Sequence, residues 1–185
     1  MLPPDPNDDR VEIRCPRCGG RAMWEEPFAF SSRRKGAAEE LERLVPWGGW
    51  LVREKFPSLI RWKAPARGQG YFYHQQGVVR CRACHLVSLH RLCWPEDAFF
   101  RWNVRGARLY ALDEEHARVL LDYIGSRLRD PNRYGEWYRK GLQRLPGEVM
   151  DGHARERVAG QIAETLRAHG IPLGPPPLAG RRGTE

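Results

Sequence analysis

The sequence lacks any hydrophobic run long enough to cross a bilayer. No stretch of the 185 residues approaches the ~18 to 20 consecutive apolar residues that a spanning helix needs. The N-terminus, Met1-Leu2-Pro3-Pro4-Asp5, has no basic segment followed by an apolar one, so we expect no secretory signal peptide. These absences predict a protein that stays out of the membrane and resides in the cytoplasm.

Recognisable catalytic motifs are also missing. The chain contains neither a glycine-rich phosphate loop nor a nucleophile elbow. Asp113, Glu114, Glu115 and His116 lie close together but lack the HExxH spacing, and acidic residues at a helix start are expected from the helix dipole alone. We therefore predict no catalytic residues. An enzyme whose active site is built from distant residues is a third hypothesis, ranked after the nucleic-acid-binding and protein-adaptor hypotheses given below.

Cysteine is scarce, and its placement is the sharpest chemical feature of the chain. Four of the five cysteines form two Cys-x-x-Cys pairs, Cys15 with Cys18 and Cys81 with Cys84. Each such turn lets two thiolates converge on one ion, and two turns supply the four soft ligands that tetrahedral zinc prefers. The spacing predicts one structural Zn²⁺ site with these four cysteines as ligands.

The chain resembles the zinc-ribbon class, in which two such turns, called knuckles, on adjacent β-hairpins hold one zinc ion. The resemblance rests on the four cysteines and on Cys15-Pro16-Arg17-Cys18-Gly19, and it covers roughly residues 11–30 and 76–110. It implies an antiparallel zinc-ribbon sheet. The 62 residues between Cys18 and Cys81 exceed the 15 to 20 of compact ribbons, so a long insertion is expected between the knuckles.

Several alternatives for the cysteines stay open at this stage. Iron held as in rubredoxin uses the same ligands, whereas a redox pair is disfavoured because Gly19-Gly20 makes a poor first helical turn after Cys18. His85 occupies the position after the second pair where glycine is usual. His85, His90 or Cys93 could replace a nominal ligand, but a lone cysteine such as Cys93 is more typically a small buried hydrophobe.

The charge of the chain points weakly to nucleic acid. The formal net charge is +8, and 27 of the 31 basic residues are arginine. Four thiolates on a divalent ion would reduce this net charge to about +6. The cations are spread along the chain without a basic tail, so the charge alone does not define a binding surface.

Aromatic and basic residues alternate within the insertion between the knuckles. Such a pattern suits a single-stranded nucleic acid, because rings can stack on bases while cations neutralise phosphates. The preferred explanation, however, is that a small domain covers itself with large side chains, because aromatic residues bury the most area each. The nucleic-acid hypothesis nominates Arg53, Lys55, Arg61, Trp62, Lys63, Arg67 and Tyr71. The competing hypothesis is a protein–protein interaction adaptor.

Hydrophobic periodicity predicts an α+β protein of two folded regions. The first, residues 11–112, is the zinc-ribbon domain with its insertion at 31–75. We expect its strands to form one continuing meander, at 11–14, 22–24, 86–89, 99–104 and 107–112. A short helix is expected within the insertion, at 36–45. The second, residues 113–170, is a helical module with helices at 113–129, 136–145 and 153–169. Residues 1–10 and 171–185 are expected to be disordered.

Overall fold

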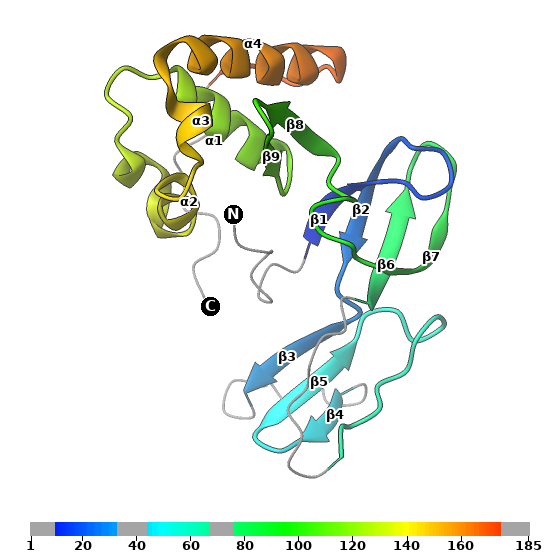
Figure 1. The fold of residues 1–185 in the computed structure, drawn as a ribbon. Coiled ribbons are helices and arrows are strands. Elements are labelled where there is room, and N and C mark those ends of the chain that lie inside the picture. Colours follow the sequence, from blue (N-terminus) through cyan, green and yellow to red (C-terminus); the bar gives the residue numbers. More distant parts are fainter. Residues whose placement is uncertain (1–9, 33–43, 67–75, 175–185) are drawn as a thin grey trace. The chain divides into compact units, whose positions relative to one another are not determined.

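The computed structural model describes residues 10–32, 44–66 and 76–174, which form antiparallel sheets and helices (Figure 1). The α+β class is therefore confirmed. The chain divides into two compact units between Cys93 and Trp94. This boundary differs from the expected one at residue 112, because the last strand pair lies in the second unit with the helices.

A four-stranded antiparallel sheet contains both cysteine pairs in the first unit. Its strands are β1 (Arg10–Arg14), β2 (Arg21–Glu25), β6 (Gln76–Cys81) and β7 (Val87–Arg91), in the order β1-β2-β6-β7. Two hairpins, β1–β2 and β6–β7, are joined by pairing of β2 with β6, where Ala22 lies opposite Cys81. The strands predicted on either side of the first pair and after the second are thus confirmed.

One face of this sheet contains a buried apolar row. Val11, Trp24 and Val79 form one buried cross-strand row. The indole of Trp24 lies directly over Gly77 and donates a hydrogen bond of 3.2 Å to the backbone carbonyl of His90. A Cβ atom at position 77 would lie 2.3 Å from Cε2 of this indole, so only glycine fits there.

The insertion contributes a second, three-stranded sheet of β3 (Phe28–Ser32), β5 (Trp50–Glu54) and β4 (Leu44–Trp47), in the order β3-β5-β4. Residues 36–43 of the predicted short helix lie outside the described residues. The prediction is wrong for its last two residues, which belong to β4, where Val45 pairs with Val52. Pro46 is tolerated because β4 is an edge strand with one unpaired side.

The second unit packs a β-hairpin against helices. Strands β8 (Phe100–Val104) and β9 (Ala107–Ala111) form their own two-stranded sheet, so the prediction that they continue the ribbon meander is wrong. The helices are α1 (Glu114–Gly125), a 3-10 turn (Pro131–Tyr134), α2 (Gly135–Leu142), α3 (Gly147–Met150) and α4 (Gly152–Ala168). The apolar face of this hairpin packs against α1 and α4.

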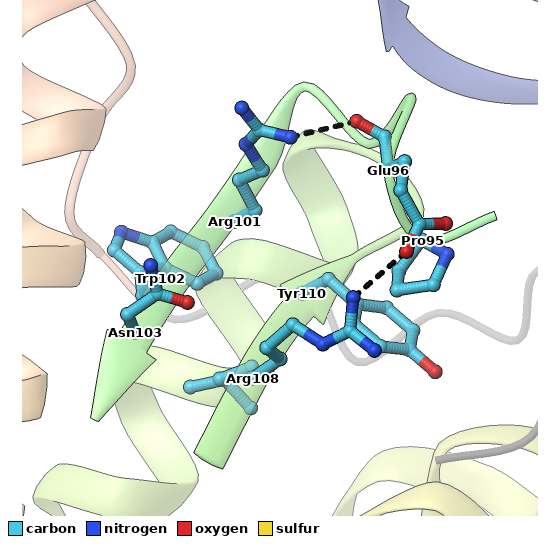
Figure 2. A pocket seen from close by; sticks show the side chains of 8 residues that line it. Pro95, Glu96, Arg101, Trp102, Asn103, Arg108 and Tyr110 are labelled. Carbon is cyan, nitrogen blue, oxygen red and sulfur yellow. Dashed lines mark hydrogen bonds and ion pairs between the residues drawn. The ribbon is translucent and has the colours of Figure 1, made fainter. Parts of the chain in front are cut away.

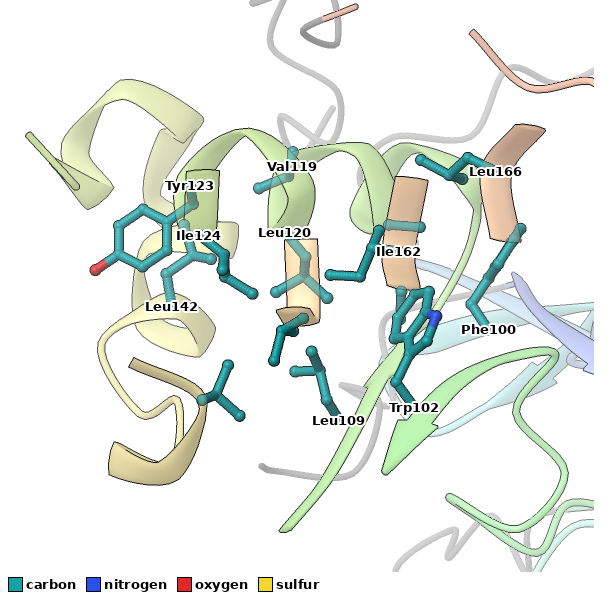
Figure 3. Close-up of a cluster of buried hydrophobic side chains, with 14 of the residues drawn as sticks. Phe100, Trp102, Leu109, Val119, Leu120, Tyr123, Ile124, Leu142, Ile162 and Leu166 are labelled. Atoms are coloured by element: carbon teal, nitrogen blue, oxygen red, sulfur yellow. The ribbon is translucent and has the colours of Figure 1, made fainter. Parts of the chain in front are cut away.

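Residues alternate between buried and exposed along β8, and the buried face is apolar. Phe100, Trp102 and Val104 are buried together with residues of β9, α1 and α4 (Figure 3). The Trp102 indole donates a hydrogen bond of 3.0 Å to the Thr165 hydroxyl. This bond gives the buried N–H a partner and fixes the hairpin against α4.

Helix α1 starts as predicted and ends earlier than predicted. The Asp113 carboxylate accepts a 2.8 Å hydrogen bond from the backbone N–H of His116, so Asp113 is the N-cap of the helix. The helix stops at Gly125 rather than at residue 129, and Leu128, beyond its end, is 86% exposed. Glycine and serine at 125 and 126 are poor helix formers, which explains the early end. No helix among the described residues is both long and apolar enough to span a membrane.

Candidate metal centre

Each cysteine pair sits in the turn of one hairpin of the four-stranded sheet. Cys15 and Cys18 lie between β1 and β2, whereas Cys81 ends β6 and Cys84 lies in the turn before β7. Because β2 pairs with β6, the two turns lie at the same end of the sheet. Pairing between strands remote in sequence thus positions all four side chains.

The four sulfur atoms form one cluster. Sγ of Cys15 lies 3.6 Å from that of Cys84, Sγ of Cys18 lies 3.7 Å from that of Cys81, and all four lie within 4.8 Å of one another. Zinc–sulfur bonds of ~2.3 Å in a tetrahedron place sulfurs ~3.8 Å apart, whereas a disulfide needs ~2.05 Å. The cysteines are free thiols with the separation of metal ligands, so the prediction that they come together is confirmed.

The backbone repeats the same turn at both pairs. The N–H of Cys15 donates to the carbonyl of Gly20 at 2.7 Å, and the N–H of Cys81 donates to the carbonyl of Leu86 at 2.9 Å. The residue after each pair has a left-handed backbone, with φ +72° at Gly19 and φ +57° at His85. His85 therefore takes up the glycine-like conformation expected from its position, at some cost in strain.

None of the alternative ligands joins the cluster. Among the described residues, the one group of cysteine, histidine and acidic side chains placed to hold an ion consists of the four paired cysteines. His85, His90 and Cys93 are not members. Cys93 is also exposed, so the prediction that it is a buried hydrophobe is wrong; it is the last residue of the first unit and follows the end of β7.

Two thiols of the cluster have shifted pKa values. Burial raises the pKa of the Cys15 thiol, but hydrogen bonds from the backbone N–H groups of Cys18 and Arg17 and from neighbouring thiols outweigh it, so the pKa falls to about 7. Burial and hydrogen bonds to the other three sulfurs raise the pKa of Cys84 to about 12. The environment of the cluster therefore shifts the pKa values of Cys15 and Cys84 in opposite directions.

Three of the predicted nucleic-acid contacts are engaged within the first unit. The ammonium of Lys55 lies 3.4 Å from the Glu25 carboxylate, and its side chain is only 12% exposed. The Arg61 guanidinium lies 3.1 Å from the carboxylate of Glu54. Trp62 is buried in an aromatic cluster, which also includes Phe28, Phe30 and Trp47.

The other predicted contacts lie in different surroundings. Arg53 and Lys63 are exposed, and Arg53 belongs to β5. Arg67 and Tyr71 lie outside the described residues. The structure therefore leaves two of the seven nominated side chains exposed with no ion pair to a described residue.

The second unit has a separate cavity of about 260 Å³ on the outer face of the β8–β9 hairpin (Figure 2). Two of its lining arginines are held by Glu96: Arg108 pairs with the carboxylate at 2.7 Å, and Arg101 donates to the backbone carbonyl at 2.7 Å. A hydrogen bond from its own backbone N–H, and then the one from Arg108, hold the pKa of Glu96 below its usual value.

Comparison of the chain with protein-family models, with curated proteins and with solved structures finds no match. The chemistry of the cysteine cluster is therefore the basis for a functional proposal.

Proposed function

We propose that the four cysteines bind one structural Zn²⁺ ion in a zinc-ribbon arrangement, and that the protein is a non-catalytic nucleic-acid-binding protein of the cytoplasm. The observation that carries the proposal is the cluster of four free sulfurs, all within 4.8 Å of one another. Thiolate ligands persist in a reducing compartment, which fits a cytoplasmic location. Zinc is preferred to iron because nothing in the chain suggests electron transfer.

The role of the ion is structural. Four thiolates complete a tetrahedral shell, so no coordination position is left for a catalytic water. The ion would link two hairpins whose knuckles are separated by 62 residues. Closing a loop of that length costs about 4 kcal/mol, whereas a structural zinc site contributes about 10 to 16 kcal/mol, so metal binding outweighs the closure cost.

Nucleic-acid binding is supported by charge. The net charge of the zinc-loaded protein is +6, because four thiolates and one Zn²⁺ add −2 to the formal +8 of the chain. Arg53 and Lys63 are exposed and have no ion pair to a described residue. These side chains can reach phosphates without first breaking an internal contact.

The test of nucleic-acid binding is its salt dependence. Neutralising about four phosphates gives a log–log slope of roughly −3 for single strands and −3.6 for duplexes. Fluorescence anisotropy of labelled oligonucleotides with zinc-loaded full-length protein measures this slope between 50 and 200 mM salt. Absence of binding at the lowest salt would exclude the nucleic-acid part of the proposal and leave the metal site unaffected.

A protein-interaction adaptor is the second candidate, and exposed apolar side chains favour it. Trp50 is 48% exposed and Val45 is 38% exposed, both in the three-stranded sheet of the insertion. Large exposed apolar residues that lie together are typical of docking surfaces. The adaptor hypothesis predicts a stable protein complex that Trp50→Ala disrupts and that is insensitive to moderate salt.

A further inference from the structure

We propose that Arg14, Arg17 and Arg82, at the metal-binding end of the four-stranded sheet, form the main phosphate-contacting surface of the protein. This inference rests on the proposed nucleic-acid function and assigns its contact surface to the knuckles rather than to the insertion. Their grouping depends on the pairing of β2 with β6, which joins two hairpins remote in the sequence.

The three arginines are grouped by the cysteines beside them. Arg14 ends β1 directly before Cys15, Arg17 lies within the first Cys-x-x-Cys turn, and Arg82 lies within the second. The sulfurs of both turns lie within 4.8 Å of one another, so the two backbones that bear these arginines are held side by side. All three residues are exposed, and their surface exists only while the two turns stay together.

Acidic side chains do not neutralise this surface. Glu12 is the one acidic residue within residues 10–22 and 80–91, and Arg21 occupies both of its carboxylate oxygens at 2.8 and 2.6 Å. Within the described parts of the chain, Arg14, Arg17 and Arg82 make no ion pair. By contrast, Lys55 and Arg61 of the insertion each lie within 3.4 Å of a carboxylate.

The chemistry of the surface fits the phosphodiester backbone of a nucleic acid. A guanidinium binds phosphate through two parallel hydrogen bonds, and three of them on adjacent turns can engage successive phosphates. Val87 opens β7 just after the second turn and is 53% exposed, so it offers an apolar contact for a sugar or base. An acidic peptide would use the guanidinium groups but would gain less from this apolar neighbour.

The two negative charges of a zinc–thiolate cluster suggest a rival role for the same arginines, namely to offset that charge. The roles are separable, because charge compensation affects metal retention whereas phosphate contact affects oligonucleotide binding and its salt slope. The experiment therefore measures zinc content and oligonucleotide affinity in the same samples.

The test compares three double variants of the zinc-loaded full-length chain. Arg17→Ala/Arg82→Ala removes two proposed contacts, Arg53→Ala/Lys63→Ala removes two cations of the insertion, and Arg127→Ala/Arg144→Ala removes two exposed arginines of the second unit. All three lower the net charge equally. Labelled single-stranded and duplex oligonucleotides are titrated at several salt concentrations.

We expect the knuckle variant to keep one zinc per chain. Each phosphate contact raises the binding constant for a single strand about five-fold at 0.1 M salt relative to 1 M. Removing two contacts should therefore lower the single-strand affinity of the knuckle variant about 25-fold at 0.1 M salt. The magnitude of its log–log slope should decrease by about 1.4. The variant of the second unit should change affinity less than three-fold. A greater loss in the knuckle variant than in the insertion variant supports the assignment.

Other outcomes overturn the inference in distinguishable ways. If the wild-type protein binds oligonucleotides and only the insertion variant binds them less tightly, the knuckle surface is refuted. The proposed function is then unaffected. Loss of zinc from Arg17→Ala/Arg82→Ala would point to a role of the arginines in holding the metal. That role is established if Arg17→Lys/Arg82→Lys regains oligonucleotide affinity only in samples that also regain zinc. A wild-type protein that binds an acidic peptide and no oligonucleotide refutes both proposals.

Discussion

Replacing Gly77 by alanine tests whether the sheet is packed as described. The Cβ atom of alanine would lie 2.3 Å from Cε2, 2.5 Å from Cζ2 and 2.6 Å from Nε1 of Trp24. An ordinary contact begins near 3.4 Å, so the indole must withdraw by about 1 Å (3.4 − 2.3). That movement strains its 3.2 Å hydrogen bond to His90.

The expected cost follows from these displacements. Overpacking of a core costs about 1 to 3 kcal/mol, and a weakened hydrogen bond adds about 1 kcal/mol. Alanine at a glycine site with compatible backbone instead stabilises by about 0.4 to 1 kcal/mol through the unfolded chain. The sum predicts that Gly77→Ala lowers the free energy of unfolding of the first unit by about 1 to 4 kcal/mol.

Hydrogen exchange measured by mass spectrometry on peptides of β2 and β6 reports this unit separately from the helices. Gly49→Ala is the control, because a Cβ atom at Gly49 meets nothing within 4 Å. In a Trp24→Leu background the effect of Gly77→Ala should shrink, since the rigid ring is gone. Equal or greater protection in Gly77→Ala, or an undiminished effect in the Trp24→Leu background, would refute the packing.

Three further perturbations test other parts of the structure. Gly160 lies at an exposed position inside α4, and a Cβ atom added there would meet no atom within 4 Å. Gly160→Ala should therefore stabilise the second unit by about 1 kcal/mol in urea denaturation, because alanine is the better helix former. A destabilised variant would contradict this. Tyr134→Phe removes the 2.7 Å hydrogen bond to the Asp122 carboxylate and should cost about 1.5 to 3 kcal/mol. Burial and Asp122 raise the pKa of Tyr134, so the wild-type protein should lose this stability as pH rises above about 10. The decline should be smaller in Tyr134→Phe, where only other raised tyrosines such as Tyr110 contribute. Chelation of the metal should increase hydrogen exchange in β1, β2, β6 and β7 while α1 and α4 stay protected; unchanged exchange in the strands would show that the ion does not support the sheet.

Local patterns in the sequence predict much of the metal site. The Cys-x-x-Cys spacing indicates the ligands, and Gly19 indicates the left-handed residue after the first pair, because both are properties of a single turn. Alternation along β8 likewise identifies Phe100 and Trp102 as core residues. Each of these features is decided within a few residues of the chain.

Features that depend on remote pairing could not be predicted in this way. Trp62 and Lys55 look like surface contacts in the sequence, but the fold of the insertion packs the ring against Phe28 and brings the ammonium to Glu25. The short helix was expected because Leu44 and Val45 continue a helical spacing, whereas pairing with β5 makes them a strand. Tertiary contacts override local periodicity in both cases.

The most direct measurement of the central claim is zinc analysis with X-ray absorption at the zinc edge, on full-length protein purified under reducing conditions. We predict one zinc ion per chain with four sulfur neighbours at ~2.3 Å and no nitrogen or oxygen ligand. Variants Cys15→Ser and Cys84→Ser should each lose the ion. A protein without stoichiometric metal, or a zinc ion bound by fewer than four sulfurs, would contradict the proposed site.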